Sequence, residues 1–139
     1  MFQMKITIDT NVLISGSFWA GASDKILEKI ENKEIELFLS KDIIEEFSEV
    51  LDYEEIKNKI RDKGLELRRT IEKIISISTI IEPLEKFDIV EEDPDDNKIL
   101  ECAVEGKVNY IISQDKHLLK LKEFQDIKIL TPEEFCSIL

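Results

Sequence analysis

Short apolar segments rich in β-branched residues alternate along the whole chain with segments whose apolar residues recur at helical spacing. This alternation is typical of α/β folds, in which helices connect the parallel strands of one sheet. The sequence predicts strands at Met4–Ile8, Ile35–Leu39, Thr79–Ile81, Val108–Ile112 and Ile127–Leu130. It predicts helices from Ser23 to about Glu31, from the residue after Ser40 to Leu51, at Tyr53–Lys63 and at Gly64–Ser78. Further helices are predicted from near Asp95 to a C-cap at Gly106, around Leu118–Leu121 and from Pro132 onward. We therefore expect an α/β fold with a largely parallel sheet.

A single domain is expected for residues 1–139, because this length suits one core and the sequence contains neither repeats nor linkers. No apolar run approaches the roughly 20 residues of a membrane-spanning helix, and the N-terminus lacks the pattern of a signal peptide. The two cysteines, Cys102 and Cys136, form no CxxC pair. We expect a cytoplasmic protein that does not enter a membrane.

The net charge of −12 should repel nucleic acid at long range, because Lys and Arg lead the binding of phosphate. The charge is uneven, however. Between Lys57 and Lys73 the chain carries seven basic residues and only three acidic ones. This basic stretch is either a solvated helical face or a route by which phosphate approaches, with Arg68, Arg69 and Lys73 as candidate RNA-binding residues.

Two aspartates follow predicted strands. Asp9 comes directly after the first strand and is followed by Thr10 and Asn11, and Asp115 comes after the strand that ends at Ile112. Ligands of open α/β sheets bind beyond the carboxyl ends of the strands, where such carboxylates could hold a cation. The plainer interpretation is that each aspartate caps the turn that follows it.

Helical spacing selects two further acids. In the helix after Ser40, Glu46 lies on the flank of the apolar stripe, whereas Glu45 and Glu49 lie opposite it and should face water. In the helix that begins near Asp95, Asp96 falls on the apolar face, so its carboxylate needs a partner or a metal ion. Asp96 could instead satisfy amides at the start of its helix, with Asp95 as the N-cap.

Four carboxylates in one crevice would repel one another unless a cation offset their charge. Mg²⁺ and Mn²⁺ prefer oxygen ligands, and His117 is the only histidine, so no His or Cys cluster competes. The sequence therefore predicts a Mg²⁺ or Mn²⁺ site formed by Asp9, Glu46, Asp96 and Asp115.

Four motifs in order resemble the PIN domain family: Ile-Thr-Ile-Asp-Thr-Asn-Val-Leu around Asp9, Ile-Ile-Glu-Glu-Phe around Glu46, Asp-Asp-Asn-Lys-Ile-Leu-Glu-Cys-Ala from Asp95, and Ile-Ile-Ser-Gln-Asp-Lys up to Lys116. The resemblance covers essentially the whole chain. Its nearest branch is the small prokaryotic, VapC-like PIN proteins described as toxins of toxin–antitoxin pairs.

The resemblance implies a three-layer α/β/α fold around a sheet of four or five strands. It implies a Mg²⁺- or Mn²⁺-dependent endoribonuclease that uses Asp9, Glu46, Asp96 and Asp115 as catalytic and metal-binding residues. Thr10, Asn11 and Ser113 would support the site. An RNA substrate, a cognate antitoxin and a homodimer are the implied partners.

The sequence leaves two alternatives open. A Mg²⁺-dependent phosphatase normally needs a second Asp two residues after the first, where this chain has Asn11, and a phospho-receiver needs paired acids at its first strand. A PIN-like scaffold that binds RNA or protein without cleavage would not need four acids.

Overall fold

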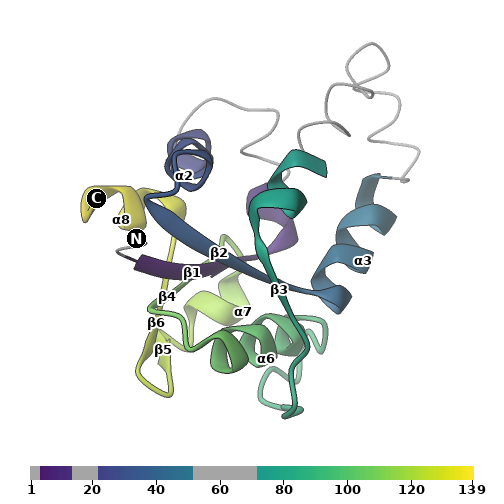
Figure 1. The fold of residues 1–139 in the computed structure, drawn as a ribbon. Helices are drawn as coiled ribbons and strands as arrows, with labels where there is room; N and C mark the ends of the chain where they lie inside the picture. The colour runs from purple at the N-terminus through teal and green to yellow at the C-terminus, as the bar shows by residue number, and fades with distance from the viewer. Residues whose placement is uncertain (1–3, 14–21, 52–71) are drawn as a thin grey trace.

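The computed structural model describes residues 4–13, 22–51 and 72–139, and the predicted alternation of strands and helices is present in them (Figure 1). The strands are β1 (Met4–Ile8), β2 (Ile35–Ser40), β3 (Thr79–Ile81), β4 (Tyr110–Ile112), β5 (Glu123–Phe124) and β6 (Ile127–Leu130). The helices are α2 (Ala22–Glu31), α3 (Lys41–Leu51), α6 (Asp96–Gly106), α7 (Lys116–Leu119) and α8 (Pro132–Ser137). Residues 10–13 and 72–77 are also helical. The predicted helix Tyr53–Lys63, most of Gly64–Ser78, and Arg68 and Arg69 lie outside the described residues.

One sheet carries all six strands, in the order β3-β2-β1-β4-β6-β5. Every neighbouring pair is parallel except β5 and β6, so the expected largely parallel α/β fold is confirmed. The count exceeds the expected four or five strands because of β5. That strand has only two residues, too few for an apolar alternation to be visible in the sequence.

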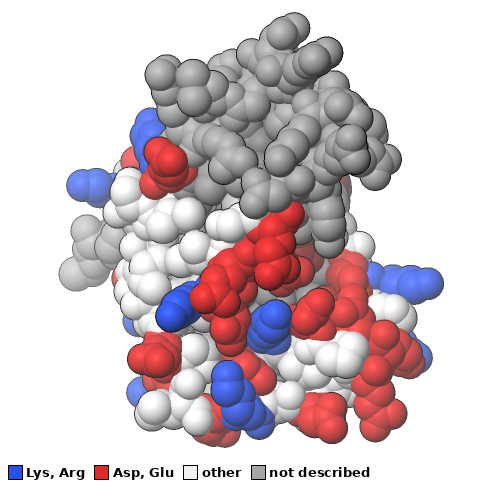
Figure 2. All heavy atoms as spheres, turned by 90° about the vertical axis from the view of Figure 1, so that its right-hand side faces the viewer, with Lys and Arg blue, Asp and Glu red and all other residues white. Residues whose placement is uncertain are grey.

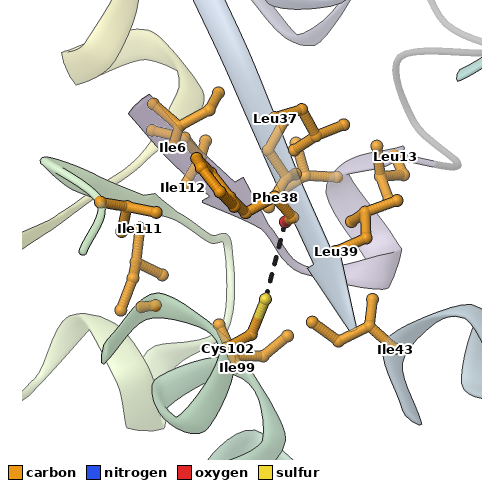
Figure 3. Close-up of a cluster of buried hydrophobic side chains, with 14 of the residues drawn as sticks. Ile6, Leu13, Leu37, Phe38, Leu39, Ile43, Ile99, Cys102, Ile111 and Ile112 are labelled. Atoms are coloured by element: carbon orange, nitrogen blue, oxygen red, sulfur yellow. Dashed lines mark hydrogen bonds between the residues drawn. The ribbon is translucent and has the colours of Figure 1, made fainter. Parts of the chain in front are cut away.

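Helices cover both faces of the sheet. In Figure 1, α2 and α8 lie on one side of the strands and α6 and α7 lie on the other. The central strands are apolar because both of their faces are covered, and Ile6, Leu37 and Ile111 are fully buried. Figure 3 shows this core, where the Cys102 thiol on α6 donates to the carbonyl of Phe38 on β2 at 3.7 Å. No helix in the described ranges has the length and apolarity that crossing a membrane requires.

Gly106 is not the C-cap of α6, as the sequence predicted it to be; it is the last residue of the helix. The C-cap of α6 is Lys107, which takes the left-handed conformation at φ 52°. A Cβ on Gly106 would lie 2.9 Å from Cγ of Phe38, so the glycine permits close packing of α6 on β2.

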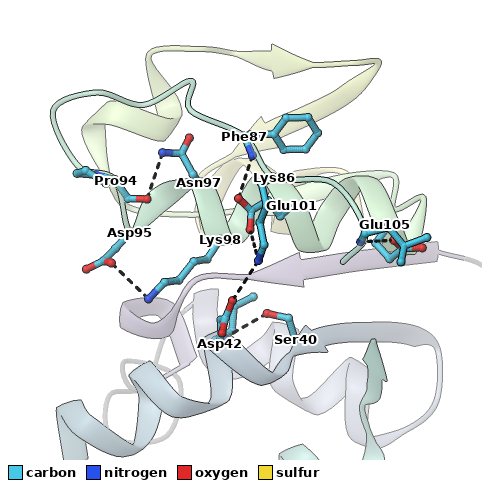
Figure 4. A network of polar contacts seen from close by, with 12 residues as sticks. Ser40, Asp42, Lys86, Phe87, Pro94, Asp95, Asn97, Lys98, Glu101 and Glu105 are labelled. Atoms are coloured by element: carbon cyan, nitrogen blue, oxygen red, sulfur yellow. Dashed lines mark hydrogen bonds and ion pairs between the residues drawn. The ribbon is translucent and has the colours of Figure 1, made fainter. Parts of the chain in front are cut away.

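A row of polar side chains on α6 holds the segment that leads from β3 back to this helix. Asn97, Glu101 and Glu105 are spaced one turn apart, which places them on one face of α6 (Figure 4). The Glu105 side chain accepts from the Leu84 amide at 2.9 Å, and the Glu101 side chain accepts from the Phe87 amide at 3.0 Å. These residues, which we call the polar row, satisfy backbone amides in a segment that belongs to no strand.

Asn97 completes the polar row and uses both ends of its amide. Its Oδ1 accepts from the Ile89 and Val90 amides at 2.9 and 3.0 Å. Its Nδ2 donates to the carbonyls of Val90 and Pro94 at 3.2 and 3.1 Å. The loop before α6 is therefore fixed to the first turn of that helix.

Candidate metal centre

The site lies where β1 and β4 end side by side at the carboxyl edge of the sheet. Their register pairs Ile8 with Ile112, so the residues that follow the two strands meet directly. The Ser113 hydroxyl donates to Oδ2 of Asp9, and the Val12 amide donates to Oδ1 of Asp9 at 2.9 Å. Asp9 thus caps the short helix of residues 10–13 while its carboxylate stays at the edge of the sheet.

An open pocket collects acids from four separate segments of the chain. It is lined by Asp9, Thr10, Asn11, Glu46, Asp93, Asp95, Asp96, Ile99 and Asp115. All four acids that the sequence selected are among these residues. Ser113 lies behind Asp9, fully buried. Figure 2 shows Asp and Glu gathered in a band across one face of the molecule, with fewer Lys and Arg among them.

Asp96 is the most constrained of these acids. It is 8% exposed, and its Oδ2 has no hydrogen-bond partner in the part of the chain that the structure describes. Burial raises the pKa of its carboxyl from 3.8 to about 8, with further contributions from the charge of Asp115 and a hydrogen bond to it. This burial agrees with the position on the apolar face of the helix that helical spacing predicted for Asp96. The alternative in which Asp96 caps α6 leaves the free Oδ2 unexplained.

Asp95 holds the N-cap position, as expected, but its side chain makes no capping hydrogen bond. Instead it forms an ion pair with Lys98 at 3.3 Å (Figure 4). Its side chain remains 66% exposed at the rim of the pocket.

Glu46 reaches the pocket from α3. It is half-buried, whereas Glu45 and Glu49 on the same helix are exposed, as the position of the apolar stripe indicated. Burial raises the pKa of Glu46, and the charges of Asp95 and Asp9 raise it further, against the opposing effect of Lys98.

Asp115 both caps a helix and lines the pocket. Its Oδ1 accepts from the His117 amide at 2.7 Å, and its own amide donates to Oγ of Ser113 at 2.9 Å. Ser113 therefore bridges the two strand-end aspartates, donating to Asp9 and accepting from Asp115.

The donor set suits a hard divalent cation. Carboxylate oxygens of Asp93, Asp96 and Asp115, one from each, lie within 4.8 Å of one another. Within the described ranges, Oδ2 of Asp96 and the hydroxyl of Thr10 have no hydrogen-bond partner, and both are buried at the same pocket. Burial also raises the pKa of Asp9, although the hydrogen bonds from Ser113 and Val12 oppose it. Oxygen-only ligands with excess negative charge fit Mg²⁺ or Mn²⁺.

Two features of the site were not predicted from the sequence. Asp93 is not among the four acids that the sequence selected, and the structure brings it to the pocket beside Asp96. The polar row was also missed, although its spacing of one turn was visible in the sequence. Of the three candidate RNA-binding residues only Lys73 is described; it is exposed and pairs with Glu31 at 3.7 Å.

The chain is similar to known proteins over most of its length. The profile of a family described as the PIN domain matches residues 5–117. Among solved structures the chain is similar to PAE2754 from Pyrobaculum aerophilum, at 14% identity and a TM-score of 0.59, over 97% of this chain and 96% of that one. It is also similar to VapBC2 from Rickettsia felis, solved bound to a DNA fragment from its promoter. This similarity has 13% identity and a TM-score of 0.60, over 91% of this chain and 97% of that one. No curated protein matches the sequence.

Proposed function

The chain belongs to the PIN domain family, and from this premise we propose that it is a Mg²⁺- or Mn²⁺-dependent endoribonuclease that hydrolyses phosphodiester bonds of single-stranded RNA. The observation that carries the proposal is the buried Oδ2 of Asp96, which has no hydrogen-bond partner among the described residues and lies in a pocket lined by five further carboxylates. Burial and the neighbouring Asp115 raise the pKa of this carboxyl to about 8, so ionising it is costly, and a bound cation would offset that cost.

Asp9, Glu46, Asp96 and Asp115 would hold the metal. A bound divalent cation would lower the pKa of a water molecule and neutralise charge that develops on the phosphate. The chain contributes orientation: Ser113 and the Val12 amide fix the Asp9 carboxylate, so that it does not rearrange during the reaction.

Glu46 is suited to orient the attacking water and accept its proton. Its half-buried carboxylate lies at the pocket wall, where a carboxylate can act as a general base. Thr10 and Asn11 line the same pocket beside Asp9, where they can position substrate or water.

A role as the toxin of a toxin–antitoxin pair is the second part of the proposal. It is supported by the family and by the similarity of the fold to VapBC2 of Rickettsia felis. A toxin of this kind would act on cytoplasmic RNA, bind a cognate antitoxin and form a homodimer. Co-purification with the product of a neighbouring small gene, and light scattering at micromolar concentration, test these partners.

The experiment that tests the nuclease uses purified protein, a single-stranded RNA and Mn²⁺ or Mg²⁺. We expect cleavage that EDTA stops and that Asp9→Asn reduces by about 10³-fold or more, because the loss of a ligand removes several kcal/mol of transition-state stabilisation. Glu45→Gln, on the exposed side of α3, is the control and should cleave as wild type. Cleavage that resists both EDTA and Asp9→Asn would contradict the mechanism and favour a scaffold that binds without cutting.

A further inference from the structure

Asp93 lies in a group of three carboxylates that differs from the four acids expected to hold metal. Asp93 comes from the loop before α6, Asp96 from the first turn of α6, and Asp115 from the residue before α7. One oxygen from each lies within 4.8 Å of the other two. We call Asp93, Asp96 and Asp115 the three-acid group. Neither Asp9 nor Glu46 belongs to it.

An independent observation points to a ligand at this group. Asp96 is more than nine-tenths buried, lines the pocket, and leaves Oδ2 without a partner among the described residues. The hydroxyl of Thr10 is 4% exposed, lines the same pocket and is likewise unpartnered. Buried polar atoms are nearly always paired, so two unpaired oxygens at one pocket indicate a bound species that accepts oxygen ligands.

Asp93 is held in this position rather than resting there by chance. The Asp96 amide donates to the Asp93 carbonyl at 3.0 Å, and the Asn97 side chain fixes the chain on both sides of Asp93, at Val90 and Pro94. These hydrogen bonds oppose the mutual repulsion of the carboxylates, which would otherwise move the loop away. The position of the loop is therefore fixed by contacts that do not involve the three carboxylates.

Asp9 presents a contrast. Both of its carboxylate oxygens already accept hydrogen bonds, from Val12 and Ser113. In the three-acid group, by comparison, Oδ2 of Asp96 has no hydrogen-bond partner among the described residues. One oxygen each of the half-buried Asp93 and Asp115 lies within 4.8 Å of an oxygen of Asp96.

We propose that Asp93 is a metal ligand, and that Asp93, Asp96 and Asp115 together bind one divalent cation, Mg²⁺ or Mn²⁺. This inference deepens the proposed function and rests on it for the identity of the cation. It adds a ligand that the sequence motifs did not select.

The test measures binding of Mn²⁺ alone by titration calorimetry and by the electron paramagnetic resonance signal of free Mn²⁺. Wild type is compared with Asp93→Asn and with the control Asp95→Asn. The control removes the same charge two residues further along the chain, from a side chain that pairs with Lys98. We expect Asp93→Asn to weaken Mn²⁺ binding at least tenfold, since even residues that only support a ligand cost 10–100-fold. Asp95→Asn should weaken it less than Asp93→Asn does, because the Asp95 side chain is 66% exposed and already paired with Lys98.

Thermal melting supplies a second readout. Without metal, Asp93→Asn should melt at or above the wild-type temperature, since it relieves repulsion within the three-acid group. With Mn²⁺ it should gain less stability than wild type. In the Asp96→Asn background, Asp93→Asn should weaken Mn²⁺ binding by a smaller factor than it does in wild type, because both residues act on one bound ion and their effects are not additive.

Equal Mn²⁺ affinities for Asp93→Asn and Asp95→Asn would overturn the inference. If RNA cleavage still depended on Asp9, the proposed function would survive that result. Conversely, a protein that cleaves no RNA but loses Mn²⁺ binding on Asp93→Asn would contradict the nuclease and uphold the three-acid site.

Discussion

Ser113 donates a hydrogen bond to the Asp9 carboxylate across the parallel strands β1 and β4, joining residues 104 positions apart in the sequence. The same hydroxyl accepts from the Asp115 amide. One small side chain therefore sets the separation of the two strand-end aspartates. Thr and Cys carry an extra methyl group or a longer bond, so this fully buried position suits serine best.

Ser113→Ala should destabilise the protein by about 1–3 kcal/mol, because it leaves a buried carboxylate oxygen without its donor. RNA cleavage should fall as well, since Asp9 loses its fixed orientation. Urea unfolding measures the first effect and cleavage rates the second. Ser76→Ala is the control: its exposed hydroxyl donates only to the Lys73 carbonyl within the helix of residues 72–77. A Ser113→Ala protein as stable and active as wild type would show that the bridge is dispensable.

Glu46→Gln should reduce cleavage by about 10²-fold or more, the usual contribution of a general base. Glu49→Gln, one turn away on the exposed face of α3, should leave the rate unchanged. Single-turnover rates on the same RNA compare the two. If Glu49→Gln were inactive and Glu46→Gln active, the assignment of Glu46 as the acid on α3 that acts in cleavage would be wrong.

Metal-free protein should lose stability as the pH rises. The pKa of Asp96 is about 8 in the folded state against 3.8 as the ordinary value, because of burial and the charge of Asp115. A carboxyl whose pKa is raised in the folded state stabilises the folded form at pH values below its pKa in the unfolded chain. This contribution is lost as the pH rises through about 8. Melting temperatures in EDTA should therefore fall from about pH 5 to about pH 9. In Mg²⁺ the trend should weaken, because the cation competes with the proton, and Asp96→Asn should flatten it in EDTA.

Asn97→Ala should destabilise the protein by about 2 kcal/mol or more, since it strips partners from the amides of Ile89 and Val90. Hydrogen exchange at those two amides should then become faster, because Asn97 protects them in a segment that belongs to no strand. Mn²⁺ affinity should fall in parallel, because the loop that carries Asp93 is released. Asn32→Ala, at an exposed position after α2, is the control and should alter none of the three measurements.

Replacing Arg68 and Arg69 by Gln should weaken RNA binding and reduce its salt dependence, by roughly 0.7 in log–log slope for each RNA phosphate that the protein no longer neutralises. The prediction rests on the concentration of positive charge between Lys57 and Lys73 in a chain of net charge −12. Filter binding at several salt concentrations measures it. Unchanged affinity and slope would assign these residues to a solvated face or to a partner protein.

Local patterns were sufficient to predict most of the fold. The strands are apolar and β-branched, and their helices show clear stripes, so β1, β2, β3 and β6 appear within a residue of their expected bounds. Helical angle also separated Glu46 from Glu45. Both predictions depend only on periodicities that are fixed by backbone geometry.

The polar row and Asp93 could not be predicted in this way, because they depend on the path of the chain after β3. Glu101 is 7% exposed, against the usual tendency of glutamate to face solvent. Its burial makes sense only once the Phe87 amide is known to lie beside it. The Lys86 ammonium then neutralises it at 3.5 Å and also reaches Asp42 on α3 at 3.8 Å (Figure 4).

The polar row also has a kinetic consequence. Its hydrogen bonds join residues separated by 7, then 14, then 21 positions, from Val90–Asn97 to Phe87–Glu101 to Leu84–Glu105. If these hydrogen bonds form in order of increasing separation, each step adds little loop-closure entropy. Doubling the separation from 7 to 14 costs about 0.6 kcal/mol. Pairing β1 with β4 instead requires a closure of 104 positions. We expect substitutions at Asn97 to slow folding more than they speed unfolding. Asp93 and Asp96 would thus be placed together early, and Asp115 would join them only when β4 enters the sheet.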